Sequence, residues 1–181
     1  MLLITGATGQ IGTALMRELA SRSVPFRALL RTNAKTTSIR AFGGEVALGD
    51  FAQPVSLRAA LQGIERVFLL SPLLPDKVRL ESNLIAAAKQ TGVQTIVKLS
   101  AAGAAEHSSA LLLKQHGQVE RFIEASGFVF THVRPAPFMQ NLAYSAGGIA
   151  RQGTISLPAG VAQTAFVDVR DIAAVVATVL T

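Results

Sequence analysis

Short apolar runs alternate with amphipathic stretches along the whole chain. The apolar runs predict strands at residues 1–4, 25–31, 45–50, 66–71, 95–101 and 128–135. Apolar residues at helical spacing predict helices between them, at residues 11–22, 34–42, 56–63, 78–92 and 109–127, and one more at the end of the sequence. Regular alternation of strand and helix is typical of a parallel sheet with right-handed crossovers. We therefore predict an α/β fold, a doubly wound parallel sheet with helices on both faces.

Glycine positions support these helix ends. Gly63, Gly92 and Gly127 each fall just past a predicted helix, where a left-handed cap is expected. A loop of small residues, AAGAAEHSS at 101–109, follows the fifth predicted strand. Sheets of this kind bind ligands beyond the carboxyl ends of their strands, so we expect this loop near a binding site.

Composition agrees with a sheet that is covered on two faces. Half of the residues are apolar and 15% are charged, compared with about a quarter in an average domain. The length suits a single domain over residues 1–181. No apolar run is long enough to cross a bilayer and no secretory signal pattern opens the sequence, so we expect a cytoplasmic protein without a membrane partner. The absence of cysteine excludes disulfides and thiolate metal sites.

The formal net charge of +6 raises nucleic acid as a partner. The basic residues are scattered, however, and the sequence has no tryptophan and one tyrosine that could stack on bases. A solvated basic surface with some anion-facing residues is therefore favoured, and no nucleic-acid partner is expected.

The first loop, ITGATGQIG, carries glycines at Gly6, Gly9 and Gly12, a spacing that differs from the G-x-G-x-x-G dinucleotide fingerprint. It nevertheless joins a predicted strand to a predicted helix, which is the context of a phosphate-binding turn. Gly6 would permit the tight turn, Gly9 would let the backbone approach a pyrophosphate, and Gly12 would let helix pack on strand. Glycines that merely mark a turn are the alternative, and a Walker loop is excluded because no Lys-Ser/Thr pair follows. The N–H groups that would bind the pyrophosphate lie around Thr8, Gly9, Gln10 and Ile11.

The end of the second predicted strand bears on which dinucleotide is bound. Strands at this place in NAD-binding folds end in an acidic residue that binds the ribose 2′-OH. Here the strand ends in Arg31 and Lys35 follows, so two cations stand where a 2′-phosphate would lie. We therefore predict NADP(H), with NAD(H) as the alternative, since both residues could be plain surface charges. After the third strand, Asp50 would bind the adenine amine and Phe51 would line its pocket, although Asp is also a common turn residue.

Several motifs, taken in order, resemble those of one family: TGATGQIG, GDF, FLLSP, AAKQTGVQTIVKLSA, HGQVERFIEASG, RPAPFMQNL and FVDVRDIA. Over essentially its whole length the chain resembles the NmrA-like branch of the atypical short-chain dehydrogenase/reductases, and within it the bacterial quinone and triphenylmethane-dye reductases. The resemblance implies a Rossmann sheet of six or more strands in the order 3-2-1-4-5-6. It also implies a small C-terminal substrate lobe, which we expect to be reduced or absent here, with residues 136–165 forming a flap or partial lobe.

The same resemblance implies further cofactor contacts. They fall after the fourth strand and in the segment that lines the nicotinamide, at Leu70, Ser71, Pro135 and Phe138. Phe138, Met139 and Phe166 would form an apolar wall for an aromatic acceptor, or else belong to the core.

The catalytic residues of short-chain dehydrogenases are only partly represented. These enzymes use a Tyr-x-x-x-Lys pair, in which the Lys lowers the Tyr pKa and the Tyr gives a proton to the carbonyl. Aligning the HGQVE motif puts Leu112 at the Tyr position and His116 at the Lys position. The Ser position falls at Ser100 or is shifted into the alanines that follow it. Leucine cannot transfer a proton, so the dyad is missing. The candidate catalytic residues are His116, Ser100 and Tyr144, a lone phenol that could stack on a flat substrate or simply pack.

Two functions fit this pattern. In the first, the protein binds NADP(H) and reduces a quinone or similar flat aromatic acceptor by hydride transfer, with water or His116 supplying a proton. In the second, it binds NADP(H) as a redox sensor and acts through a protein partner without turnover. We favour the reductase, a monomer or homodimer that acts on a dinucleotide and a small aromatic acceptor.

Other polar residues have alternative interpretations. His116 could face the cofactor or lie on the helix surface beside Glu120. Lys98 stands inside a strand that should be buried on both faces, where a charge is costly unless paired. It could point towards the cofactor or reach solvent at an edge, and we expect the latter. His107 and His132 have no acidic or histidine partner at metal-ligand spacing, so no metal site is expected.

Overall fold

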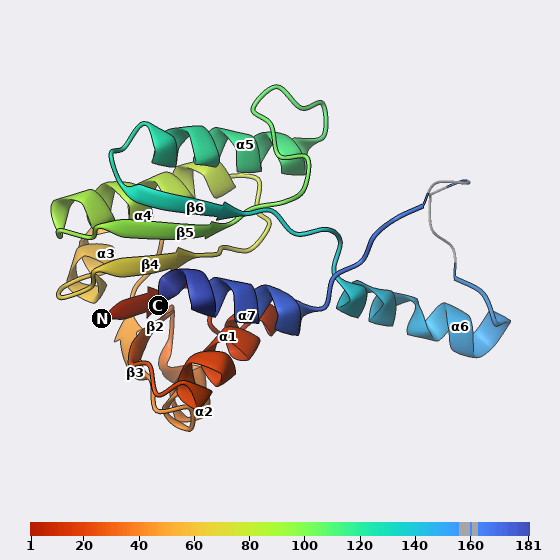
Figure 1. Ribbon diagram of the computed structural model, residues 1–181, viewed down its shortest axis with the longest axis horizontal. Helices are drawn as coiled ribbons and strands as arrows, with labels where there is room; N and C mark the ends of the chain where they lie inside the picture. Colours follow the sequence, from red (N-terminus) through yellow and green to blue (C-terminus); the bar gives the residue numbers. More distant parts are fainter. Residues whose placement is uncertain (156–159, 161–162) are drawn as a thin grey trace.

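The part of the chain that the structure describes, residues 1–155, 160 and 163–181, is built around six parallel strands. In this computed structural model the strands lie side by side in the order β3-β2-β1-β4-β5-β6 (Figure 1). Each neighbouring pair is parallel, which confirms the predicted sheet and its strand order. The strands are β1 (Leu2–Ile4), β2 (Phe26–Leu30), β3 (Glu45–Leu48), β4 (Arg66–Leu69), β5 (Thr95–Leu99) and β6 (Val129–Val133).

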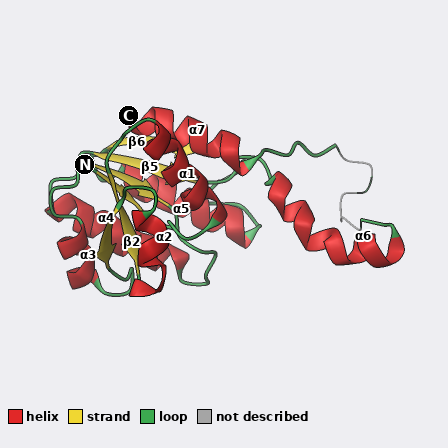
Figure 2. Ribbon diagram, turned by 90° about the horizontal axis from the view of Figure 1, so that it is seen from below, coloured by secondary structure: helices red, strands yellow, loops and turns green. Residues whose placement is uncertain are grey.

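Helices cover both faces of this sheet (Figure 1 and Figure 2). Each layer encloses its own apolar core, so the doubly wound arrangement is confirmed. One face carries α1 (Gln10–Ser21), the short helix η1 (Asn33–Lys35), α2 (Thr36–Arg40) and α7 (Val169–Leu180). The other face carries α3 (Pro54–Ala60), α4 (Lys77–Gln90) and α5 (Leu111–Glu124).

The central strand β1 shows why a sheet that is covered on both faces leaves little room for charged residues. Leu2 and Ile4 pack into the core on the α1 and α7 side, whereas Leu3 packs into the core formed with α3 and α4. Successive side chains of a strand point to opposite faces, so a strand covered on both sides needs an apolar residue at every position.

The predicted glycine caps are present. Gly63, Gly92 and Gly127 follow α3, α4 and α5 with φ angles of +73°, +82° and +83°. Side chains disfavour this left-handed conformation, and each glycine lets the chain turn back toward the next strand.

The segment after β6 leaves the body of the molecule before α7 returns to it (Figure 1). It holds η2 (Met139–Ser145) and α6 (Ala146–Gln152), in which no residue is buried. The two ends of the excursion meet in an isolated parallel bridge between Phe138 and Val167, where Met139 N–H donates to the Val167 carbonyl at 2.9 Å. The predicted flap at 136–165 includes residues 156–159 and 161–162, which lie outside the described residues, so it stays a prediction.

Among the described residues, no helix combines the length and the hydrophobicity needed to span a bilayer.

Candidate functional site

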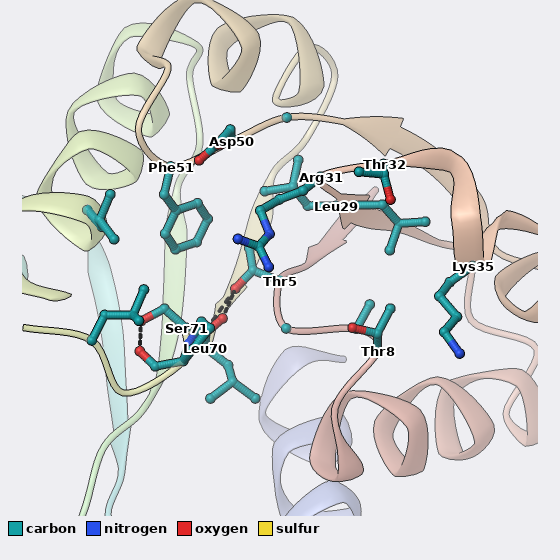
Figure 3. A pocket seen from close by; sticks show the side chains of 17 residues that line it. Thr5, Thr8, Leu29, Arg31, Thr32, Lys35, Asp50, Phe51, Leu70 and Ser71 are labelled. Carbon is teal, nitrogen blue, oxygen red and sulfur yellow. Dashed lines mark hydrogen bonds between the residues drawn. The ribbon is translucent and has the colours of Figure 1, made fainter. Parts of the chain in front are cut away.

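A cavity of about 530 Å³ opens at the carboxyl ends of the strands, where the strand order reverses between β1 and β4 (Figure 3). Open parallel α/β sheets bind ligands at this switch point. Its lining includes these predicted cofactor contacts: Gly6, Thr8, Arg31, Lys35, Asp50, Phe51, Leu70 and Ser71. The other predicted contacts lie outside the lining: Gly9, Gln10, Ile11, Gly12, Pro135 and Phe138.

The glycine loop is shaped as the sequence predicts. Gly6 has φ +63°, and a Cβ built on it would lie 2.8 Å from Leu70 Cγ. A Cβ on Gly12 would lie 2.3 Å from the Gly6 carbonyl oxygen, so the third glycine is required for α1 to pack against the loop. Gly9 N–H donates to that same oxygen at 3.0 Å and closes the turn.

The N-terminus of α1 is suited to an anion. Gly9 is its N-cap, no side chain caps the helix, and no acidic residue occupies the first turn. The first N–H groups of a helix have no partner within it and carry a partial positive charge. Gln10, Ile11 and Gly12 therefore supply backbone donors beside the cavity rather than side chains that line it.

Two cations stand at the β2 side of the cavity. Arg31 follows β2 directly and Lys35 ends η1, and both side chains line the cavity (Figure 3). Both residues are exposed, and within the described residues neither has a carboxylate partner. This pair of cations could bind a phosphate group.

Asp50 and Phe51 close the cavity from the end of β3. Asp50 Oδ1 accepts a hydrogen bond from Ala52 N–H at 2.8 Å, so the residue does shape its own turn. The Asn83 side chain from α4 donates to the Phe51 carbonyl oxygen at 2.8 Å, and this bond holds the backbone that carries the Phe51 ring. Asp50 therefore combines the turn role with a position on the cavity wall.

Thr5 is a site residue that the sequence reasoning missed. Its Oγ1 accepts from Leu70 N–H at 2.8 Å and lies 2.8 Å from the Leu70 carbonyl oxygen and 3.0 Å from that of Phe68, both within reach of its proton. These bonds fasten the end of β1 to the end of β4 in the floor of the cavity (Figure 3). The signal was a polar residue at the end of an apolar strand, immediately before Gly6.

A cluster of buried charges lies beside the cavity. Lys77 Nζ donates to Glu81 Oε1 at 2.7 Å, and Lys98 Nζ donates to Glu81 Oε2 at 2.8 Å. Each of the three residues is at most 2% exposed. The expectation that Lys98 reaches solvent at an edge is therefore wrong, because β5 lies inside the sheet and Glu81 from α4 compensates the charge.

The cluster keeps its carboxylate ionised. Burial raises the pKa of the Glu81 carboxyl, but the positive charges of Lys98 and Lys77 outweigh burial and hold that pKa below its usual value. Burial lowers the pKa of Lys98, a change that Glu81 opposes.

His116 lies on the buried face of α5, with 8% of its surface exposed, so its placement on the helix surface is excluded. Burial lowers its pKa, and the positive charges of Lys98 and Lys77 lower it further, to about 4. The imidazole is therefore neutral near pH 7. Ser100 is 4% exposed at the end of β5, and its Oγ has no hydrogen-bond partner in the part of the chain that the structure describes. Neither residue lines the cavity.

Glu120, next to His116 on the same face of α5, is bound by Arg134. The guanidinium donates to both carboxylate oxygens, at 2.9 and 2.6 Å. Burial raises the pKa of the Glu120 carboxyl, but the hydrogen bonds from Arg134, together with smaller contributions from neighbouring groups, outweigh burial and hold that pKa below its usual value. Glu120 therefore fastens α5 to the chain that follows β6.

The remaining predicted catalytic and wall residues are not brought together. Tyr144 is 83% exposed on η2, and Leu112 is exposed on α5. Phe138 is half-buried and packs against the core on the α7 side, whereas Met139 is 49% exposed, and their predicted role as a wall for the acceptor stays a prediction. Pro135 contributes its carbonyl oxygen, which accepts from Ala102 N–H at 2.9 Å.

No group of three or more metal-ligating side chains occurs in the described part of the chain. His132 Nε2 lies 3.4 Å from Glu124 Oε1, and its ring stacks on Phe130 with centroids 4.9 Å apart. His107 lies in the loop before α5, beside Glu106. One carboxylate beside each imidazole is a side-chain pair and does not make a metal site.

Gly117 is a second residue that the sequence reasoning missed. A Cβ on it would lie 2.3 Å from both Ala105 C and Glu106 N, so the loop at 101–109 presses directly on α5. The signal was a glycine inside a helical pattern, which often marks a close approach of another backbone.

Comparison with known proteins places these features in a family. The profile of the NmrA-like family matches residues 1–181. An NAD(P)H azoreductase of Xenophilus azovorans is 39% identical over 181 residues, covering all of this chain and 63% of the azoreductase. Quinone oxidoreductase 2 of Escherichia coli (strain K12) is 32% identical over 184 residues, covering 99% of this chain and 64% of that protein.

Solved structures agree with this match. The crystal structure of an Escherichia coli NADPH-dependent quinone oxidoreductase complexed with NADPH has a TM-score of 0.92 at 31% identity, covering 100% of this chain and 65% of that one. The Citrobacter sp. triphenylmethane reductase complexed with NADP(H) has a TM-score of 0.85 at 28% identity, covering 99% of this chain and 65% of that one. The chain thus spans about 63–65% of the length of these relatives. On its glycine loop, its strand order and the match over its full length, the chain belongs to the NmrA-like family.

Proposed function

We propose that this protein binds NADP(H) and reduces a quinone or a similar flat aromatic acceptor by hydride transfer. The observation that carries the proposal is the cavity at the strand ends, where a glycine turn, an aromatic side chain and two cations with no carboxylate partner among the described residues meet. The names of the relatives, an azoreductase and a quinone oxidoreductase, support the reaction class. The partners that follow are the dinucleotide and a small aromatic acceptor.

The residues present fit a dinucleotide. The absence of side chains at Gly6 and Gly12 lets the loop and α1 pack backbone against backbone, which leaves the N–H groups at the start of α1 next to the loop where a pyrophosphate would lie. Arg31 and Lys35 would bind a 2′-phosphate, which favours NADP(H) over NAD(H). Asp50 and Phe51 would hold the adenine.

The reaction proposed here needs no strong acid from the protein. A reduced nicotinamide held at this site would supply the acceptor with a hydride, which amounts to two electrons and one proton. A quinone that receives a hydride and one further proton becomes a hydroquinone, so NADPH, quinone and one proton give NADP⁺ and hydroquinone. Leu112 has no proton to give, and His116 is neutral near pH 7 because its pKa is about 4. The balancing proton then comes from water, and His116 can only offer a hydrogen bond.

Oxidation of NADPH with a quinone, an azo dye and a simple ketone tests the proposal. We expect turnover with the quinone or the dye and negligible turnover with the ketone, because a ketone needs an acid at its oxygen. Tyr144→Phe should retain quinone turnover, since the phenol is 83% exposed. Turnover of the ketone that depends on Tyr144 would contradict a reaction without a protein acid.

A redox sensor that binds NADP(H) without turnover is the second candidate. The observation that favours it is the absence of an acid at Leu112 combined with a neutral His116. Tight NADPH binding with no oxidation by any quinone or dye would support the sensor over the reductase.

A further inference from the structure

The Ser71 hydroxyl stands between the cavity and the buried charges. Ser71 lines the cavity and is 8% exposed. Its Oγ donates to Glu81 Oε1 at 2.6 Å and accepts from Lys77 Nζ at 3.0 Å. The Pro72 carbonyl oxygen, at 3.3 Å, is the more distant acceptor for the same proton. A serine hydroxyl has one proton and two lone pairs, so one lone pair remains for a group in the cavity.

The direction of these bonds follows from the charges of the two partners. An ionised carboxylate can only accept hydrogen bonds, and an ammonium group can only donate them. Glu81 is held ionised because Lys77 Nζ binds one of its oxygens at 2.7 Å and Lys98 Nζ binds the other at 2.8 Å. If Ser71 turned its proton toward the cavity, Glu81 Oε1 would lose the 2.6 Å hydrogen bond from Ser71 and keep only the one from Lys77 Nζ at 2.7 Å. Losing a hydrogen bond to a buried carboxylate is costly, so the Ser71 proton stays on the Glu81 side.

We propose that Glu81 and Lys77 are positioning residues that hold Ser71 as a hydrogen-bond acceptor toward the cavity, so that Ser71 selects a ribose hydroxyl of the bound dinucleotide. This inference rests on the proposed function, which makes a dinucleotide the occupant of the cavity. The ionised phosphate oxygens of a dinucleotide only accept hydrogen bonds, so they cannot bind to the free lone pair of the Ser71 hydroxyl. Ser71 follows β4 next to Leu70, which contacts the glycine loop where the pyrophosphate would lie. The donors that flank a pyrophosphate on both sides are ribose hydroxyls.

Binding of NADPH and of its deoxyribose analogues, each lacking one ribose hydroxyl, tests this selection. We expect the parent protein to prefer NADPH about 3- to 10-fold over one of the analogues, the scale of one hydrogen bond. Ser71→Ala should abolish this preference, whereas Ser82→Ala, a serine of α4 outside the cavity lining, should retain it. A substitution that only disturbed the local structure would weaken the binding of all the nucleotides and keep the ratio of the affinities for NADPH and the analogue. An unchanged ratio in Ser71→Ala overturns the inference.

A charge-matched pair of variants tests the role of Glu81. In Glu81→Gln/Lys98→Met the cluster keeps the net charge of one lysine, but the amide can donate to Ser71 and release its proton toward the cavity. We expect this variant to lose the preference. Lys98→Met alone leaves the Ser71, Glu81 and Lys77 contacts in place and should retain it. If the double variant does not fold, Glu81→Asp draws the carboxylate back by one methylene at constant charge and should lose the preference as well.

The outcomes separate the two proposals. Retention of the preference in both Glu81 variants, with its loss in Ser71→Ala, overturns the positioning role. An absence of NADPH binding in the parent protein overturns the proposed function together with this inference. Normal NADPH binding with no preference among the analogues overturns the inference alone. Thermal unfolding of each variant without nucleotide shows that the compared proteins are folded.

Discussion

Gly12 and Gly6 touch through backbone atoms: a Cβ built on Gly12 would lie 2.3 Å from the Gly6 carbonyl oxygen and 2.6 Å from Ala7 Cα. No flexible side chain stands there to move aside. The third glycine of the loop is therefore a packing requirement, since α1 can begin this close to the loop only when position 12 has no side chain.

Gly12→Ala should consequently displace the loop. We expect the free energy of unfolding to fall by about 1–3 kcal/mol, as for other overpacked sites, despite the better helix propensity of alanine. Gly9→Ala is the matched control, because its Cβ would meet only the Gly6 oxygen, at 3.3 Å. Urea unfolding measures both variants. Equal stabilities would show that the contact with Gly6 relaxes freely.

Arg31→Ala should separate the two dinucleotides. The guanidinium lines the cavity without a carboxylate partner among the described residues, so we expect it to bind the 2′-phosphate that only NADP(H) carries. Its loss should weaken NADPH binding by about 1–3 kcal/mol and leave NADH nearly unchanged. Arg40→Ala removes the same charge from α2 away from the cavity and serves as the control. Fluorescence titration with both nucleotides measures the effect, and equal losses for NADPH and NADH would remove Arg31 from the 2′-phosphate site.

Glu81→Gln should be strongly destabilising. It leaves Lys77 and Lys98 buried without the carboxylate that binds both, and breaking a buried ion pair costs about 3–5 kcal/mol. Glu18→Gln breaks the Arg22 pair on the surface of α1, with the same helical spacing, and should cost less than about 0.5 kcal/mol. Chemical denaturation compares the two. A small effect at Glu81 would mean that one lysine loses its proton at little cost.

His116 should make the stability depend on pH. Its folded-state pKa of about 4 lies below the unfolded value near 6.5. Above pH 6.5 the His116 imidazole is mostly neutral in both the folded and the unfolded chain, so its titration does not reduce the stability there. As the pH falls from 6.5 to 4, His116 is protonated in the unfolded chain but stays mostly neutral in the folded one. The free energy of unfolding therefore falls by roughly 3 kcal/mol.

The comparison of parent and His116→Gln isolates this effect from that of the acidic residues. Unfolding free energies measured between pH 4 and 7 should fall more steeply for the parent protein than for the variant. His107→Gln, at an imidazole with 91% of its side chain exposed, should follow the parent. Parallel curves for the parent and His116→Gln would place the folded-state pKa near its ordinary value.

The order of elements, the parallel sheet and the glycine turn between β1 and α1 were all predictable from the sequence. They depend on local regularities: apolar periodicity, glycines at helix ends, and a glycine loop between a strand and a helix. Arg31, Lys35, Asp50 and Phe51 could be placed at one cavity because the carboxyl ends of parallel strands share one edge. This rule needs no knowledge of side-chain contacts.

The partners of the buried polar groups were decided only by the tertiary structure. Lys98 on β5 and Glu81 on α4 are 17 positions apart, and no pattern of apolar and polar residues predicts that they form an ion pair. The lowered pKa of His116 likewise depends first on its burial and then on the charges of Lys98 and Lys77, which two other elements contribute. Phe138 is apolar, so its side chain fits a core as well as a cofactor wall, and only the tertiary structure shows that it packs, half-buried, against the core near α7. Local pattern determines which face of an element is buried, whereas the charge and role of a buried side chain depend on what the fold brings against it.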